Sequence, residues 1–213
     1  MALTLYYHPL SSYCMKALIA LYENDTPFTP HLVNLQDPAS RAEFLKVWPI
    51  GKFPVLADGD WMVPESSIII EYLDQKYPGK TKFIPADPDL ARQMRMRDRF
   101  FDCHVMEHMM KIVGDRMRPD GKHDPFGVEQ ARTKLQTALG LVDEAMAKKT
   151  FAIGETFTMA DCAAAPALFY AAKVAPFEAT LPNAAAYLDR LMKRPSFARA
   201  LREAEPYFHM VPK

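Results

Sequence analysis

A serine and a cysteine stand three residues apart near the amino terminus, at Ser11 and Cys14. A short apolar run (3–7) ends just before them and an amphipathic pattern follows, so both should lie at the start of a helix. A cysteine in the first position would be a redox nucleophile, because a helix amino terminus favours a thiolate. A serine hydroxyl has too high a pKa to ionise at neutral pH, and no histidine–aspartate pair beside it is evident. The pattern therefore favours Ser11 as a hydrogen-bond donor.

Two neighbouring hydroxyl groups compete for the same role. Ser12 is the second candidate, since one of the two serines must also cap the helix. Tyr7 is a reserve candidate near the end of the preceding strand, where tyrosines pack more often than they catalyse. Cys14 falls on the apolar stripe of the helix, and we expect a buried core thiol there.

The elements that must position these residues alternate between two hydrophobic periodicities. Apolar runs predict strands, and three- and four-residue spacings predict helices, in the order β-α-β-α-β-β-α. This order indicates an α/β domain with a mixed sheet over residues 1–79. The expected strands are 3–7 and 31–35, with a hairpin over 53–63; the expected helices begin near Ser11 and cover 37–48 and 65–78.

The rest of the chain carries helical patterns only. A segment rich in proline and charge (80–88) reads as a linker, and an all-helical domain (89–213) follows it. Thr158 and Asp161 form a capping box at the start of one of its helices, with Phe157 and Cys162 placed as a hydrophobic staple. The expected helices are 89–117, 128–148, 159–173, 183–193 and 195–204.

The charge and cysteine content narrows the class of protein. The 26 Lys and Arg residues balance the 26 Asp and Glu residues, so no global field attracts nucleic acid or an acidic membrane. No stretch reaches the length of a membrane span, no secretory signal is evident, and three cysteines make no disulfide framework. We therefore expect a cytoplasmic protein. We interpret a run of arginines as a solvated helix face on which Asp98 and Asp102 are their partners. These arginines are Arg92, Arg95, Arg97 and Arg99.

Four motifs in order resemble the cytosolic glutathione transferases. They are Ser-x-x-Cys at 11–14, "PIGKFPVL" at 49–56, "ESSIII" at 65–70 and "FTMAD" at 157–161. The resemblance covers essentially the whole chain and implies a thioredoxin-like first domain followed by a helical second domain. It includes the theta- and zeta-like classes, in which a serine opens the first helix, and Ser11 equally matches the nucleophilic cysteine of omega-like members.

The resemblance also implies a site for glutathione. Ser66, at a helix amino terminus, would hold the γ-glutamyl carboxylate, and Glu65 would favour the nearby ammonium. A cis bond before Pro54 would turn the backbone of Phe53 toward an extended peptide, a short piece of β-augmentation. Lys52 would meet the glycyl carboxylate. Ser11 would donate to the glutathione sulfur and favour its thiolate.

The leading hypothesis is accordingly a detoxifying transferase that conjugates glutathione to small hydrophobic electrophiles. It needs no cofactor beyond glutathione as co-substrate. Met106, Met109 and Tyr170 are candidates to line the site of the hydrophobic partner, because methionine is a soft and adaptable lining. The resemblance also implies a homodimer, in which Asp98 or Asp102 would reach the γ-glutamyl site of the partner.

Three alternatives stay open. Two serines in succession also permit a glutathione-dependent isomerase of the zeta type, although Tyr13 and Cys14 depart from that pattern. Domains of this fold also serve as non-catalytic interaction modules in translation and transcription complexes. Finally, His104, Glu107 and His108 form an H-x-x-E-H pattern that could hold zinc on one helix face.

Overall fold

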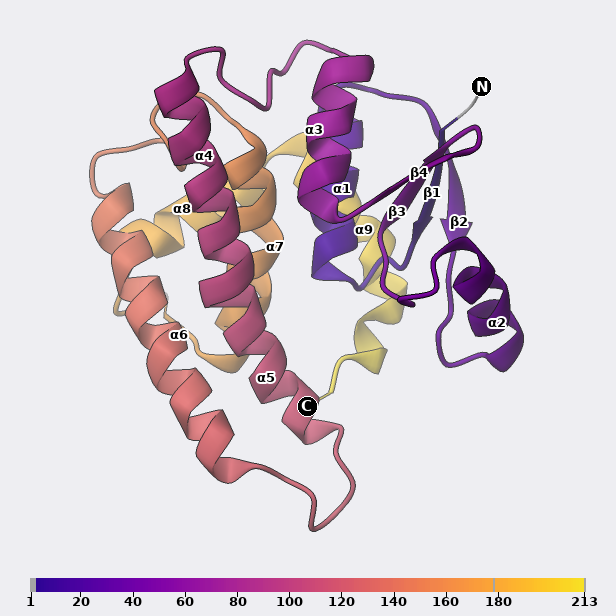
Figure 1. Ribbon diagram of the computed structural model, residues 1–213. Coiled ribbons are helices and arrows are strands. Elements are labelled where there is room, and N and C mark those ends of the chain that lie inside the picture. The colour runs from indigo at the N-terminus through magenta and orange to yellow at the C-terminus, as the bar shows by residue number, and fades with distance from the viewer. Residues whose placement is uncertain (1–2, 178, 213) are drawn as a thin grey trace.

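The computed structural model describes residues 3–177 and 179–212 and contains a four-stranded mixed sheet with the order β2-β1-β3-β4. β1 pairs in parallel with β2 and antiparallel with β3, and β3 pairs antiparallel with β4. The helical part of the chain lies beside this sheet (Figure 1). The strands are β1 (Leu3–Tyr7), β2 (Phe28–Leu32), β3 (Val55–Asp58) and β4 (Trp61–Pro64).

Three helices accompany the sheet. α1 (Ser12–Glu23) and α3 (Ser66–Lys76) pack together and join the main core. α2 (Pro38–Val47) covers a separate small core, formed where Phe44 meets Val33 and Val55. Because α1 and α3 both begin at the carboxyl-terminal side of a strand, their amino termini are available to line a common site.

The second part of the chain is helical, as predicted. Its first helix runs through three segments without a break, and its middle segment η1 (Phe101–Met106) is π-helical. A π segment changes which face each residue presents, and such segments are frequent at functional sites. The other helical segments are α4 (Pro88–Phe100), α5 (Glu107–Arg116), α6 (Pro125–Met146), α7 (Met159–Val174), α8 (Pro182–Met192), α9 (Pro195–Ala204) and the 3₁₀ segment η2 (Glu205–Met210).

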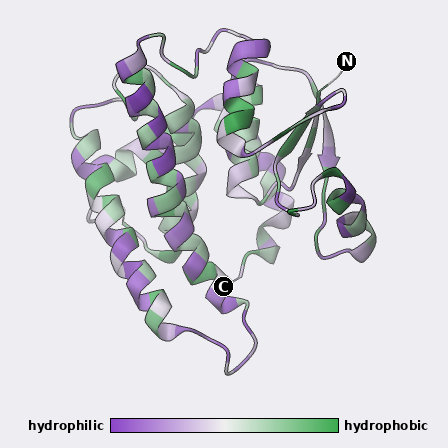
Figure 2. Cartoon of the chain, in the orientation of Figure 1, coloured by the Kyte–Doolittle hydropathy of each residue, from purple (hydrophilic) through white to green (hydrophobic). Residues whose placement is uncertain are grey.

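α7 is the centre of the molecule and packs against α1, α4 and η1. The predicted capping box at its start is present: the backbone N–H of Thr158 donates to Asp161 Oδ2 at 2.8 Å. Figure 2 shows hydrophilic residues along much of α4 and α6. No helix of the described residues is long and apolar enough to cross a membrane.

The predicted architecture, a thioredoxin-like sheet domain followed by helices, is confirmed, with one strand displaced. The second strand was expected at 31–35 but is formed by Phe28–Leu32. Pro30 lies within it, opposite Leu5 of β1. Proline has no N–H for a ladder, but β2 is an edge strand of the sheet, where proline is tolerated. Periodicity alone could not show that this strand lies at an edge.

Candidate functional site

A cavity of about 210 Å³ lies where the sheet domain meets the helix formed by α4, η1 and α5. One wall comes from the loop before β3 and the start of α3, and the opposite wall comes from α4, η1 and the start of α5. It therefore joins both parts of the chain. Its lining is Tyr13, Trp48, Lys52, Phe53, Pro54, Glu65, Ser66, Arg99, Asp102, Cys103 and Glu107.

The amino terminus of α3 opens into this cavity. Glu65 is the N-cap residue, has φ of 70°, and makes no side-chain capping bond. The next residue, Ser66, is only 5% exposed, and its hydroxyl has no hydrogen-bond partner among the described residues. Uncapped amides and a free hydroxyl at a helix start make a favourable position for an anion. The structure thus brings together Glu65 and Ser66, as the sequence analysis expected.

The loop before β3 forms the neighbouring wall. The Phe53–Pro54 peptide bond is cis, as the resemblance implied. The backbone N–H and C=O of Phe53 form no hydrogen bond with the described residues, and Pro54 is buried. Lys52 is exposed at the edge of the cavity, and Trp48 lies beside it. This wall therefore offers free backbone groups and a cation.

The amino terminus of α1 presents three hydroxyl groups in different ways. Ser11 is the N-cap residue, and its Oγ accepts from the backbone N–H of Cys14 at 3.3 Å. This bond uses a lone pair of the oxygen and does not use the hydroxyl hydrogen. Ser12 is buried, and neither serine lines the 210 Å³ cavity. Tyr13 does line it, on the side of η1.

The environment of α1 decides which of its groups can ionise. Burial, together with the nearby Asp102 carboxylate, raises the pKa of the Tyr13 phenol to about 12. Burial likewise raises the pKa of the Cys14 thiol to about 12, although the hydroxyl of Ser11 lowers it. Cys14 is fully buried, so the expected core thiol is confirmed. Tyr7 does not line the cavity; its pKa is raised by burial and by Glu203 of α9.

The wall formed by α4 and η1 was not anticipated. Arg99 donates to Cys103 Sγ at 2.8 Å and lies 3.4 Å from Asp102 Oδ2, so a guanidinium joins two lining residues. Glu107 stands one helical turn further along. The spacing of these residues in the sequence predicts a helix. It does not show which face of that helix meets the sheet domain. No local pattern predicts the π segment, which sets that face.

The interpretation of Asp98 was wrong. It was expected to pair with the exposed arginines or to reach a partner subunit, but its side chain is 1% exposed and lies 2.6 Å from Lys16 Nζ. Arg95 pairs with Glu71 of α3 instead, and Arg92 pairs with Asp89. An aspartate inside a run of arginines resembles a surface residue in sequence, and only the packing of α1 on α4 shows otherwise.

Two further cavities lie in the helical part of the chain. One of about 280 Å³ is lined by Met109, Tyr170 and Phe208 among other apolar residues, and also by Arg116 and Lys173. Tyr170 also donates its hydroxyl hydrogen to the carbonyl oxygen of Leu10 at 2.7 Å, beside Ser11. Met106 is buried and lines none of the cavities described here.

The other cavity, of about 600 Å³, lies between η1, α5 and α6 and contains His104, Glu107 and His108. These three are the residues of the H-x-x-E-H pattern. Among residues 3–177 and 179–212, no group of three or more His, Cys, Asp or Glu side chains is arranged to hold a metal ion. Burial lowers the pKa of His108. The zinc alternative therefore gains no support from the arrangement.

Comparison with known proteins identifies the family. Residues 5–81 match the N-terminal domain of glutathione S-transferases, and residues 125–190 match the C-terminal domain. The two matches follow the order of the sheet domain and the helices. The chain belongs to the glutathione S-transferase family.

Individual relatives of this transferase span nearly its whole length. A stringent starvation protein A homolog of Coxiella burnetii is 27% identical over 95% of this chain and 93% of its own. Glutathione S-transferase hmp2 of Hypomyces subiculosus is 26% identical over 89% of this chain and 93% of its own. The crystal structure of a glutathione S-transferase of Methylobacillus flagellatus with glutathione bound superposes with a TM-score of 0.85, at 28% identity, covering 93% of this chain and 98% of that one.

These findings confirm the predicted family and the predicted enzyme class, a glutathione S-transferase. They do not assign the chain to a theta- or zeta-like subclass. The roles of the individual site residues stay predictions.

Proposed function

We propose that this transferase conjugates glutathione to small hydrophobic electrophiles through a thiolate that a hydroxyl group stabilises. The observation that carries the proposal is the open amino terminus of α3, where the largely buried Ser66 lines a cavity and its hydroxyl makes no hydrogen bond to the described residues. A helix amino terminus with free amides and a free hydroxyl favours an anionic ligand group.

The cavity offers one group for each polar handle of glutathione. Ser66 and the first amides of α3 suit the γ-glutamyl carboxylate, and Glu65 suits its ammonium. The free backbone N–H and C=O of Phe53 can pair with the extended peptide. Lys52 suits the glycyl carboxylate. The related structure from Methylobacillus flagellatus, which has glutathione bound, supports this assignment.

The thiol of glutathione would then meet the amino terminus of α1. Ser11 is our first choice as donor to the sulfur, because its oxygen accepts from the backbone of Cys14 and that bond does not use the hydroxyl hydrogen. Ser12 is the second choice and Tyr7 the reserve. The cavity that contains Met109 and Tyr170 is our choice for the electrophile, because Tyr170 is bonded to Leu10 next to Ser11. Met106 would support that cavity from the core.

The proposal also covers the oligomeric state, the cellular location and the domain boundaries. Large apolar side chains on β4, α3 and α4 are exposed, which favours a homodimer that covers them. Sedimentation should show about twice the 24.2 kDa of one chain at micromolar concentration. We also propose a cytoplasmic location. The proposed domains are a sheet domain over residues 1–79 and a helical domain over residues 89–213, joined by a linker at 80–88. Their terminal residues, 1 and 213, lie outside the described residues. The exposed side chains are Trp61, Met62, Ile68, Leu90 and Met96.

A second candidate function is a non-catalytic interaction module. The likeness to a stringent starvation protein A homolog favours it, since that relative is not named as a transferase. The two candidates differ in their requirement for the cavity: conjugation needs glutathione bound there, whereas an interaction module does not.

The test is retention on immobilised glutathione followed by a panel of electrophiles. Aryl halides, epoxides, peroxides and maleylacetoacetate-type isomers would be assayed with glutathione, so that transferase, peroxidase and isomerase activities are separated. We expect retention and turnover of an aryl halide, both lost in Ser66→Ala. No retention and no turnover would overturn the transferase proposal in favour of the interaction module.

A further inference from the structure

Two cations lie on the cavity that we propose for the electrophile. Among the described residues that line it, the only charged side chains are Arg116, in the last turn of α5, and Lys173, in the last turn of α7. The rest of its lining is apolar, apart from the phenol of Tyr170. The 210 Å³ cavity differs, because three carboxylates accompany two cations there. The 280 Å³ cavity therefore combines an apolar body with an excess of positive charge, which favours an anionic ligand group.

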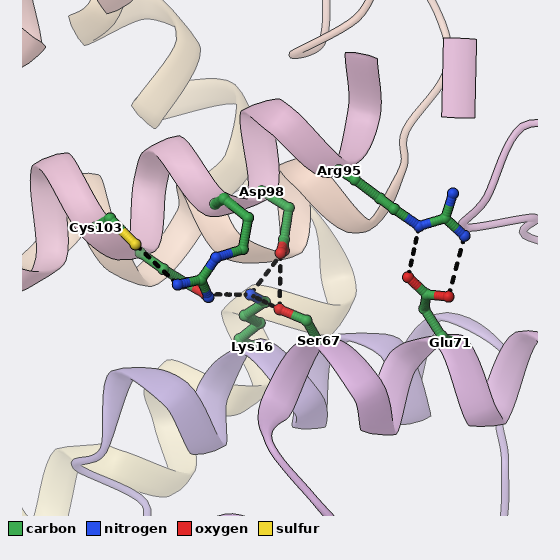
Figure 3. Close-up of polar contacts among 8 residues, drawn as sticks. Lys16, Ser67, Glu71, Arg95, Asp98 and Cys103 are labelled. Atoms are coloured by element: carbon green, nitrogen blue, oxygen red, sulfur yellow. Dashed lines mark hydrogen bonds and ion pairs between the residues drawn. The ribbon is translucent and has the colours of Figure 1, made fainter. Parts of the chain in front are cut away.

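Neither of these two cations forms an ion pair within the part of the chain that the structure describes. Cations that lie between neighbouring helices do have carboxylate partners. Lys16 Nζ lies 2.6 Å from Asp98 Oδ1, and Arg95 Nε lies 2.8 Å from Glu71 Oε1, as Figure 3 shows. Such pairs hold α4 against α1 and α3. A cation without a carboxylate partner at a cavity wall is instead available to an anion of a ligand.

Arg116 uses one of its donors to hold the end of the chain. Its Nη1 donates to the carbonyl oxygen of Pro212 at 3.2 Å, which ties the carboxyl-terminal segment to the end of α5 (Figure 1). A guanidinium has five N–H donors in a planar fork. Its side chain makes no other hydrogen bond with the described residues. The remaining donors can therefore meet a carboxylate in a bidentate geometry.

Lys173 is held over two aromatic rings. Its Nζ lies 4.6 Å from the ring centroid of Phe169 and 5.4 Å from that of Phe208. Phe208 lines the cavity, so the contact keeps the ammonium group at the cavity wall. Lys173 does not satisfy the carbonyl oxygen of Val174 at the end of α7, which accepts from Arg132 Nη1 at 3.1 Å. The three N–H donors of the ammonium group have no acceptor among the described residues.

The distance from the proposed thiol site indicates where the anion lies on the electrophile. Tyr170 lines the same cavity and donates to the carbonyl oxygen of Leu10, next to Ser11. Lys173 comes one helical turn later on α7, about 5 Å along the helix axis. This is close to the width of a benzene ring. An electrophile whose reacting carbon lies near Ser11 would therefore carry its anion on the opposite side of such a ring.

We propose that the electrophile carries a carboxylate, and that Lys173 and Arg116 bind this group while the apolar lining holds the rest of the molecule. This inference rests on the proposed function, because it names the class of co-substrate at that same site. Pockets for small molecules have volumes of about 300–1,000 Å³. The cavity, at about 280 Å³, suits a compound with a single ring. Both cations determine specificity and take no part in the bond changes.

An aryl chloride gives the reaction step in full. The thiolate sulfur of glutathione attacks the ring carbon that bears the chlorine, and the thiol proton has passed to solvent. A carbon–sulfur bond forms, and the carbon–chlorine bond breaks with its electron pair, which leaves as chloride. The carboxylate is the same before and after. Its contacts therefore stabilise the substrate and the transition state alike, and their loss should raise KM with kcat nearly unchanged.

The first test compares two aryl chlorides at saturating glutathione. One is a chlorodinitrobenzoate with its carboxylate para to the chlorine, and the other is the primary amide of the same acid, which has the same shape without the charge. Each kcat/KM is divided by the rate constant of the uncatalysed reaction with glutathione, because the two rings differ in reactivity. The unmodified protein should favour the carboxylate about 10-fold on this scale, through a lower KM.

Substitutions at one cation then assign the preference. Lys173→Met removes the charge and keeps a long apolar stem, and it should lower kcat/KM for the carboxylate about 3- to 10-fold while the amide stays within about twofold. Lys173→Arg should retain the preference, and Lys173→Glu should reduce it further than Lys173→Met does. Lys76→Met is the matched control, because Lys76 is an exposed lysine in the last turn of α3 that lines none of the cavities described here. It should affect neither substrate.

Two other measurements check the site independently. Both cations are exposed, so the preference for the carboxylate should shrink between about 0.01 and 1 M salt, as the Debye length falls from about 30 to about 3 Å. Calorimetry with the chlorine-free dinitrobenzoate and its amide measures binding without reaction. The benzoate should bind about 10-fold more tightly than the amide, and Lys173→Met or Arg116→Gln should remove most of that difference.

The outcomes separate this inference from the proposed function. If the protein turns over neither aryl chloride and is not retained on immobilised glutathione, the conjugation proposal fails, and calorimetry alone decides on the anion site. If it conjugates the amide as efficiently as the carboxylate, or if Lys173→Met weakens both substrates alike, conjugation stands and the anion site is overturned. A preference for the carboxylate that survives in both Lys173→Met and Arg116→Gln would likewise overturn the assignment to these two residues.

Discussion

Tyr170 of α7 and Leu10 of the loop before α1 are joined by a hydrogen bond of 2.7 Å from the phenol to the backbone carbonyl, across 160 positions of the chain. Burial raises the pKa of Tyr170, so the phenol remains a donor throughout the neutral range. The bond fixes the loop that carries Ser11 against the helical domain. It also places Tyr170 between the proposed thiol site and the cavity proposed for the electrophile.

Removing this hydroxyl with Tyr170→Phe should leave the Leu10 carbonyl without its partner. We expect the free energy of unfolding to fall by about 1 kcal/mol and the melting temperature to fall by about 2–4 °C. The rate of conjugation at saturating glutathione should also fall, because Ser11 loses its fixed position. Tyr207→Phe is the control, since that hydroxyl makes no hydrogen bond among the described residues. Equal effects of the two variants would contradict the role of the Leu10 bond.

Ser11→Ala should raise the apparent pKa of bound glutathione. A charge-assisted hydrogen bond is worth about 1.5–3 kcal/mol, and each 1.36 kcal/mol shifts a pKa by about one unit. The bound thiol should therefore titrate about one to two units below a free thiol in the unmodified protein and lose that shift in the variant, with affinity nearly unchanged. The ultraviolet absorbance of the thiolate in the binary complex measures it.

Three other hydroxyls serve as comparisons in the same titration. Ser12→Ala, Tyr7→Phe and Tyr13→Phe each remove one hydroxyl near the start of α1. If Ser11→Ala leaves the titration in place and one of these three moves it, that residue is the donor. Tyr13 joins the comparison because it alone of the three lines the 210 Å³ cavity.

Local patterns were enough to predict the order of the elements. The capping box of Thr158 and Asp161 and the hairpin over β3 and β4 depend on neighbours in sequence, so they could be predicted from spacing. β2 was displaced because its pairing with β1 decides its position, and Pro30 obscured it. Long-range pairing has no local signal.

The same distinction applies to the site. Glu65, Ser66 and Pro54 belong to local motifs and lie together as expected. The residues of η1 could not be predicted, because their direction depends on a π-helical turn and on how two domains pack. Lys16 was missed for a related reason: within α1 a lysine reads as a surface residue, and its buried partners lie 51 to 86 positions away.

Thiol labelling should distinguish one cysteine from the other two. Cys14 and Cys162 are fully buried, and burial raises the pKa of both thiols. Cys103 is partly exposed beside the Arg99 guanidinium. Because the thiolate is the reactive form, iodoacetamide at pH 8 should label Cys103 alone in the folded protein, as read by mass spectrometry.

Two controls accompany the labelling. Cys103→Ser should abolish rapid modification, and unfolding in urea should expose the other two thiols to the reagent. Rapid labelling of Cys14 in the folded state would show that the start of α1 opens, and would contradict the buried environment described for it. Glutathione bound in the adjoining cavity should slow the modification of Cys103, which gives an independent measure of occupancy.

The Asp161 carboxylate accepts several hydrogen bonds in addition to the one that forms the capping box. Besides the backbone N–H of Thr158, its two oxygens accept from the Thr158 hydroxyl at 3.0 Å, the backbone N–H of Ala152 at 2.8 Å and the Tyr187 hydroxyl at 2.6 Å. The side chain is fully buried. The cap thus links the start of α7 to the turn before it and to α8.

Asp161→Ala should therefore destabilise the protein far more than the loss of an exposed cap. It leaves several buried donors without an acceptor, and we expect a loss of about 3–5 kcal/mol in the free energy of unfolding, measured by urea titration at pH 7. Thr158→Ala removes the cap hydroxyl and should cost about 1 kcal/mol. Asp189→Ala, at an exposed carboxylate, should stay within about 0.5 kcal/mol. If Asp161→Ala costs no more than Thr158→Ala, its bonds to Ala152 and Tyr187 contribute little to stability, and α7 is held by apolar packing alone.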